Sequence, residues 1–121
     1  MGRLAIEETD GVTVAAFQDS KILDDSVIQQ IGAELLECVN QTSNGRLLLD
    51  FSRVRFMSSA MLGRLVMLHG KCKKANVALK MCCLADNLAE VFKITNLHKM
   101  FDIQRDKEKA IAAFGKKGWF G

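Results

Sequence analysis

Several features that would define the class of this chain are missing from its 121 residues. No apolar run approaches the roughly 20 residues that a membrane-spanning helix needs, so we expect no membrane partner. No basic segment followed by an apolar one suggests a secretory signal, which favours a cytoplasmic location. Proline is absent, and nine glycines with 49% apolar residues are ordinary for a soluble α/β protein.

Charge of one sign is not concentrated anywhere in the sequence. The net charge is +3, and 17 Lys and Arg residues are interleaved with 14 Asp and Glu residues. A nucleic-acid-binding domain carries a clustered basic face, so we expect no nucleic acid partner. The length fits one domain that buries roughly 65% of its unfolded surface. We predict that this domain spans residues 3–115, with residues 116–121 as a C-terminal tail.

Motifs for catalysis and metal binding are also missing. There is no G-x-S-x-G elbow, no paired carboxylate in a strong context, and only two histidines. Gly63 and Gly70-Lys71 fail as a P-loop, because no Ser or Thr follows the lysine. His69 and Cys72 share one helical turn, but zinc needs at least three protein ligands. The sequence therefore predicts no enzyme activity, no metal and no cofactor.

The four cysteines show neither C-x-x-C pairing nor the spacing of a disulfide framework. We expect Cys38, Cys72, Cys82 and Cys83 to pack as small apolar residues of a cytosolic protein. Cys82 and Cys83 are consecutive in a predicted strand, and consecutive strand residues point to opposite faces of a sheet. We therefore expect these two side chains to lie apart.

The first half of the chain predicts a hairpin, a helix and a buried strand. Asp10-Gly11 is a typical hairpin turn, so the segments around it are predicted to be two antiparallel edge strands. Ser26 and Gln29 form a capping-box pattern at the start of a helix. The unbroken apolar run 47–49 is typical of a strand that is covered on both faces. The predicted elements are strands 4–8, 12–17 and 47–50, with helix 26–40 between the last two.

The second half predicts alternating helices and strands. Helix 60–75 ends in lysines that complement the helix dipole, and Asn76 is a plausible left-handed terminator. Strand 77–84 is expected to run parallel to strand 47–50, because crossovers that pass through a helix join parallel strands. Asp106 is predicted to cap a last helix that closes at Gly115. The remaining predicted elements are helix 85–94 and strand 101–104. For Trp119 and Phe120 in the tail, three alternatives stay open: they fold back on the domain, bind a partner or stay free.

Ser58 and Ser59 are the local feature of the sequence that most specifically indicates a functional site. They lie where a buried strand passes through a short loop into a helix, and both are good N-cap residues. One interpretation is purely structural, with a cap worth roughly 1 kcal/mol. The other is a phosphorylation switch for partner binding. A helix N-terminus stabilises a phosphate electrostatically, and the charge of that phosphate would repel a docked partner.

The sequence DFSRVRFMSSAMLGRL, residues 50–65, resembles the loop and helix start of STAS domains. These domains are shared by bacterial anti-sigma-factor antagonists and the cytoplasmic tails of sulfate transporters. The family pattern is roughly D-h-S-x-V-x-F-h-D-S-[ST]-G-h-x-x-L, where h is apolar. The resemblance implies an α/β fold, a single STAS-like domain with a mixed β-sheet of about five strands and about four helices. The matching residues are Asp50, Ser52, Val54, Phe56, Met57, Leu62 and Leu65.

Four consecutive residues depart from this pattern. Ser58 takes the position of the pattern's Asp, Ser59 that of its first serine, Ala60 that of the phosphoacceptor and Met61 that of its glycine. The usual phosphoacceptor therefore has no hydroxyl, which leaves Ser59 or Ser58 as candidate phosphorylation sites, or a switch that has been lost. Sliding the match by one residue would put Ser59 on the acceptor position but would misplace two apolar anchors, so the unshifted match is preferred.

The resemblance implies a regulatory binding module, an anti-sigma-factor antagonist whose partner is an anti-sigma factor with serine-kinase activity. Arg53, Arg55 and Arg64 flank the loop as contacts for a phosphate or a carboxylate, or as solvated surface residues. The alternative is a non-catalytic STAS subunit or scaffold of a larger assembly, such as a lipid-transport or stressosome-like complex. A homodimer is compatible with both. The candidate partner-binding residues are Met57, Ser58, Ser59, Ala60, Met61 and Arg64.

Overall fold

A computed structural model describes residues 2–115 of the chain and builds them around a mixed sheet of five strands. The strand order is β1-β2-β4-β6-β7, with β1 antiparallel to β2 and every other neighbouring pair parallel. In chain order the elements are β1 (Leu4–Thr9), β2 (Val12–Phe17), β3 (Lys21–Ile22), α1 (Asp25–Gln41), β4 (Arg46–Asp50), β5 (Phe56–Met57), α2 (Ser59–Ala75), β6 (Ala78–Cys82), α3 (Asp86–Ile94), the 3-10 helix η1 (Leu97–Lys99), β7 (Asp102–Gln104) and α4 (Lys107–Ala113).

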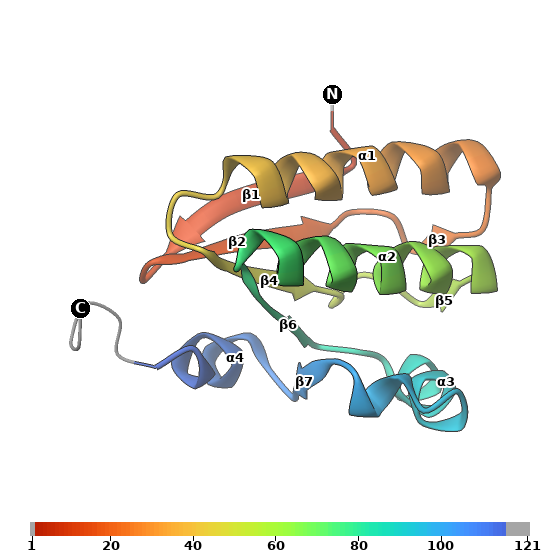
Figure 1. Cartoon of the computed structure of the whole chain (residues 1–121). Coiled ribbons are helices and arrows are strands. Elements are labelled where there is room, and N and C mark those ends of the chain that lie inside the picture. The colour runs from red at the N-terminus through yellow and green to blue at the C-terminus, as the bar shows by residue number, and fades with distance from the viewer. Residues whose placement is uncertain (1, 116–121) are drawn as a thin grey trace.

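The predicted fold class is confirmed, with four α-helices and a five-stranded mixed sheet within residues 2–115. β3 and β5 form a separate pair of short parallel strands. Helices α1 and α2 lie across one face of the main sheet, and α4 lies on the other side (Figure 1). The expectations for Trp119 and Phe120 concern residues 116–121, which lie outside the described part of the chain.

Two predictions about the first half of the chain are wrong. β2 is not an edge strand, because it pairs with β4 as well as with β1. The capping box of Ser26 and Gln29 does not form, because α1 begins at Asp25 and its N-cap is Asp24. Asp24 has an extended backbone and makes no side-chain cap hydrogen bond. The hairpin turn is confirmed, and Asp10 and Gly11 both have the positive φ that such a turn needs.

β4 is buried on both faces, as its unbroken apolar run predicts. Leu47 and Leu49 belong to the core that α1 and α2 cover, whereas Leu48 packs with Ala110 of α4 on the opposite face. This alternation follows from the two-residue period of a strand. The sheet is therefore the middle of three layers, with the long helices α1 and α2 on one face and the short helix α4 on the other.

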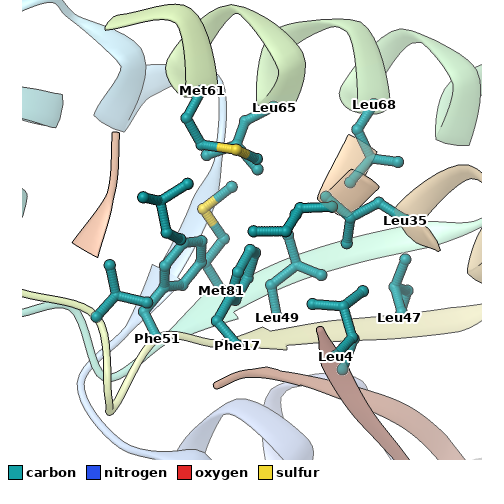
Figure 2. Close-up of a cluster of buried hydrophobic side chains, with 14 of the residues drawn as sticks. Leu4, Phe17, Leu35, Leu47, Leu49, Phe51, Met61, Leu65, Leu68 and Met81 are labelled. Carbon is teal, nitrogen blue, oxygen red and sulfur yellow. The ribbon is translucent and has the colours of Figure 1, made fainter. Parts of the chain in front are cut away.

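The main core lies between α2 and the sheet. Figure 2 shows Met61, Leu65 and Leu68 of α2 pointing toward Leu49 and Met81 on the strands. All five side chains are at most 2% exposed. Burial of this kind contributes about 1.5–3 kcal/mol for each large apolar side chain, so the buried side of α2 is fixed against the sheet.

The N-cap of α4 is expected to contribute measurably to the free energy of unfolding. The Asp106 carboxylate accepts a hydrogen bond from the Lys109 amide at 2.7 Å, which confirms the predicted cap. Asp106→Ala is expected to lower the free energy of unfolding by about 1 kcal/mol in urea denaturation. Asp24→Ala at the start of α1 is the matched control and should cost clearly less, because Asp24 makes no such bond. Equal losses would contradict this account.

Candidate partner-binding site

The candidate site lies where the β3 and β5 pair meets the N-terminus of α2. Ile22 pairs with Met57, and the Ser58 amide donates a hydrogen bond to the Ile22 carbonyl at 3.0 Å. Ser58 has an extended backbone and is the N-cap of α2, which begins at Ser59. The predicted strand, loop and helix order is therefore confirmed, and so is Asn76 as the left-handed C-cap, with φ of 59°.

Hydrogen bonds tie the loop before α2 to two distant segments. The amides of Arg55 and Phe56 both donate to the Ser20 carbonyl, at 2.7 and 3.1 Å. The Asn87 side chain in α3 donates to the Arg55 carbonyl at 2.9 Å. At the start of the loop, an Asp50 carboxylate oxygen accepts from the Ser52 amide at 2.9 Å. These bonds hold the loop in one conformation, so its exposed surface is preorganised.

The two serines differ in accessibility. Ser59 is exposed in the first turn of α2. The Ser58 hydroxyl oxygen is buried and has no hydrogen-bond partner among residues 2–115. Ser58 occupies the N-cap position without the side-chain cap hydrogen bond that such a serine usually makes. A modifying enzyme would therefore reach the Ser59 hydroxyl and not that of Ser58 in this conformation.

The remaining candidate contact residues are also not equivalent. Ala60 is exposed and Met57 is half-buried against the core. Met61 is fully buried, so the expectation that it contacts a partner is corrected. Arg64 is half-buried, and its side chain lies over Gly32 of α1. Arg53 and Arg55 are exposed on the loop.

Sequence reasoning missed the uncharged surface that α2 presents beside the loop. The exposed positions at 59–67 are Ser59, Ala60, Gly63 and Met67, and we call these four residues the α2 surface. A Cβ atom on Gly63 would meet nothing within 4 Å, so the fold itself does not need a glycine there. Such a glycine weakens a helix by about 1 kcal/mol relative to alanine. The signal was present in the sequence as uncharged residues at helical spacing, three of them small.

Exposed apolar side chains continue this surface toward β3 and β5. Phe56 is 51% exposed and Leu23, which follows β3, is 52% exposed. The Lys21 ammonium lies 5.9 Å from the centroid of the Phe56 ring. Exposed apolar side chains gathered next to an uncharged helix face are typical of a protein interaction site.

A concave region lies elsewhere on the molecule. A groove of about 630 Å³ runs between β1 and α1, and no residue of the loop or of α2 lines it. Glu7, Glu8, Glu34 and Glu37 contribute to its walls. This acidic groove is thus separate from the α2 surface, and it offers an independent region for comparison in a binding experiment.

All four cysteines are free thiols. Cys38, Cys72 and Cys82 are buried, which confirms their predicted packing role, while Cys83 is half-buried. Burial raises the pKa of all four thiols, that of Cys72 to about 11, so none is a reactive thiolate at neutral pH. The prediction that Cys82 and Cys83 lie apart is wrong, because Cys83 leaves the strand with a φ of 67° and packs beside Cys82.

None of the helices within residues 2–115 is long and apolar enough to cross a membrane.

Comparisons with known proteins agree with this geometry. The family model described as the STAS domain matches residues 3–110. The chain is 28% identical over 112 residues to the "Putative anti-sigma factor antagonist BtrV" of Bordetella bronchiseptica, which covers 93% of this chain and 94% of that protein.

Solved structures show the same fold. An anti-sigma-factor antagonist (STAS) domain protein from Planctomyces limnophilus superposes with a TM-score of 0.82 at 21% identity, over 95% of this chain and 99% of the other. The phosphorylated form of the Bacillus cell fate determinant SpoIIAA gives a TM-score of 0.68 at 18% identity, over 93% and 99%. The family match covers most of the chain and the fold agrees with it. This chain belongs to the STAS domain family.

Proposed function

We propose that this chain is a cytoplasmic anti-sigma factor antagonist that binds an anti-sigma factor with serine-kinase activity through the α2 surface and the loop before it. The similarity to the Bordetella protein extends over nearly the whole of both chains, which supports this class of function. The module would act by binding and not by catalysis. Its contact residues would be Met57, Ser59, Ala60, Gly63 and Arg64. The buried side chain of Met61 and the buried hydroxyl of Ser58 would not contact the partner but would hold the start of α2 in place.

The observation that carries the proposal is the chemistry of the α2 surface. Across residues 59–67 the exposed positions carry no charge, and the one charged residue there, Arg64, is half-buried. Lys71, Lys73 and Lys74 are exposed only toward the end of the helix. Desolvating uncharged side chains costs little, and the small residues Ser59, Ala60 and Gly63 let another backbone approach closely. Gly63 fits this use, because nothing in the chain's own fold needs it.

Phosphorylation would act on this surface through its charge. A phosphate on Ser59 would add about −1.5 to −2 charges at the first turn of α2. The helix N-terminus would tolerate that charge, so the domain would stay folded while the uncharged surface lost its partner. Ala60 stands at the usual acceptor position, so either the switch has moved to Ser59 or the chain binds its partner constitutively.

Intact mass and phosphosite mapping of protein from its native cells, with and without stress, separates these two cases. A phosphate on Ser59 that changes with conditions supports the displaced switch. Unmodified protein in all conditions supports constitutive binding. The buried hydroxyl of Ser58 makes it the poorer acceptor, so a phosphate on Ser58 would contradict the roles assigned to the two serines.

Gly63→Ala is expected to separate binding from stability. The added methyl group should stabilise α2 by up to about 1 kcal/mol. It should also weaken partner binding about 5-fold or more, because an extra methyl in a packed contact costs about 1–3 kcal/mol. Isothermal titration calorimetry and urea denaturation measure the two effects. Gly70→Ala is the matched control, since a Cβ there also meets nothing, and it should leave binding unchanged. Equal affinities for both variants would contradict the proposed surface.

The identity of the partner tests the class of function. In affinity purification from native cells, capture of a kinase of the GHKL class supports the antagonist. Capture of membrane ATPase subunits, or recovery in a megadalton particle, would instead indicate a scaffold in a lipid-transport or stressosome-like complex.

A further inference from the structure

Asp50, Cys82 and Cys83 gather at the end of two neighbouring parallel strands. Asp50 closes β4 and pairs in register with Cys82, which closes β6. A carboxylate oxygen of Asp50 and both Sγ atoms lie within 4.8 Å of one another. Asp50 is only 8% exposed, Cys82 is fully buried and Cys83 is half-buried. The cluster is therefore largely enclosed, and solvent reaches it at Cys83.

The backbone of Cys83 brings the two thiols together. Its φ of 67° is left-handed, a conformation that costs a residue with a side chain about 1 kcal/mol or more. An extended Cys83 would point to the opposite face of the sheet from Cys82. The Phe51 amide donates to the Cys82 carbonyl at 3.1 Å, which fixes the ends of β4 and β6 against each other. The turn therefore places two sulfur atoms beside one buried carboxylate.

We propose that Asp50, Cys82 and Cys83 bind a thiophilic divalent cation of the zinc class. Thiolate and carboxylate oxygen are ligands that zinc takes, at about 2.3 Å and 2.0–2.2 Å, and three protein ligands leave one position for water. Cys82 and Cys83 are protonated thiols in the free chain, so each would release its proton to solvent as the ion binds. Ligand atoms around such an ion are separated by about 3.5–3.8 Å, so rotamer adjustments suffice to close the present cluster on it. Soft sulfur ligands disfavour magnesium and calcium at the same place.

The charges around the cluster are compatible with a bound cation. Lys107 at the start of α4 faces Asp50 and Cys82, but its ammonium is held by the Glu7 carboxylate at 2.7 Å. The carboxylate of Asp106 faces Cys83 and adds negative charge. An ion of charge +2 would therefore meet Asp50 and Asp106, while the ion pair with Glu7 offsets the charge of Lys107.

A cobalt titration of the full chain tests this site. One equivalent of Co²⁺ is expected to give the near-ultraviolet charge-transfer absorption of a sulfur-bound ion, and Zn²⁺ should displace it. Cys83→Ser and Asp50→Asn should weaken binding by more than the roughly 10- to 100-fold that loss of an outer-shell partner costs. Cys38→Ser and Cys72→Ser are the matched controls, because these buried thiols lie outside the cluster and should leave the titration unchanged.

A second variant distinguishes the loss of a metal ligand from the loss of the fold. Cys83→Gly removes one ligand and relieves the left-handed backbone, so it should be at least as stable as the parent chain in urea while losing the cobalt absorption. The proposal is wrong if the parent chain shows no sulfur-to-cobalt absorption, if Cys83→Gly keeps it, or if Cys72→Ser reduces it equally. The outcome is independent of whether an anti-sigma factor binds the α2 surface.

Discussion

Ala60→Glu is expected to weaken binding of the anti-sigma factor by about 100-fold or more without unfolding the domain. Ala60 is exposed in the first turn of α2, at the centre of the proposed contact. Arg64, four residues further along α2, can pair with this carboxylate, but docking would then desolvate both charged groups. Desolvating charged groups in this way costs several kcal/mol, and about 2.8 kcal/mol corresponds to 100-fold. At the same time, a glutamate in the first turn is favourable to the helix dipole by about 0.3–1 kcal/mol. Calorimetric titration against the partner measures the loss.

The matched control for this variant is Ala112→Glu. Ala112 is also an exposed helical alanine, but it belongs to α4 on the opposite side of the sheet (Figure 1). The same charge change there should leave the affinity within about twofold of the parent chain, as for substitutions outside an interface. If Ala60→Glu binds as tightly as Ala112→Glu, the α2 surface is not the contact.

Phe51→Ala is expected to lower the free energy of unfolding by about 3–5 kcal/mol, the range for removing a large buried side chain. Phe51 is fully buried and stacks on Phe17 with ring centroids 4.5 Å apart (Figure 2). It follows β4 directly and therefore anchors the start of the loop that leads to α2. A domain of this size has a total stability of about 5–15 kcal/mol, so the loss is a large fraction of it. Urea denaturation measures it.

Phe56→Ala is the matched control for stability. Phe56 is the other phenylalanine of the loop region, but it is 51% exposed. Its removal should change the free energy of unfolding by about 0.5 kcal/mol, the usual scale for a surface substitution. Comparable losses for Phe51→Ala and Phe56→Ala would show that the aromatic stack does not hold the loop. Because Phe56 adjoins the α2 surface, its variant should reduce partner binding in spite of the small change in stability.

The sequence could predict those features that local chemistry determines. Asp10-Gly11 specifies a tight turn, the apolar run at 47–49 specifies a strand buried on both faces, and Asn76 ends α2 in the left-handed region. In each case the signal lies within a few residues of the feature, so no knowledge of the tertiary fold was needed.

Features that depend on distant partners could not be predicted in the same way. The interior position of β2 follows from its pairing with β4, which no local pattern encodes. Apolar residues occupy more than half of the circumference of helix 59–75, so the sequence alone does not show which of them face the core. Met61 is one of those that do. The two-residue period of a strand predicts opposite faces for Cys82 and Cys83, but β6 ends at Cys82 and the left-handed backbone of Cys83 breaks the period.

The most direct test of the central claim is an NMR titration, in which the backbone amide resonances of the ¹⁵N-labelled chain are followed as the purified anti-sigma factor is added. We predict that the amide resonances of residues 57–64 shift or broaden first, while those of the residues that line the acidic groove between β1 and α1 stay unchanged. Perturbations centred on β1 and α1, with residues 57–64 unaffected, would contradict the proposal that the start of α2 is where this STAS domain binds its partner.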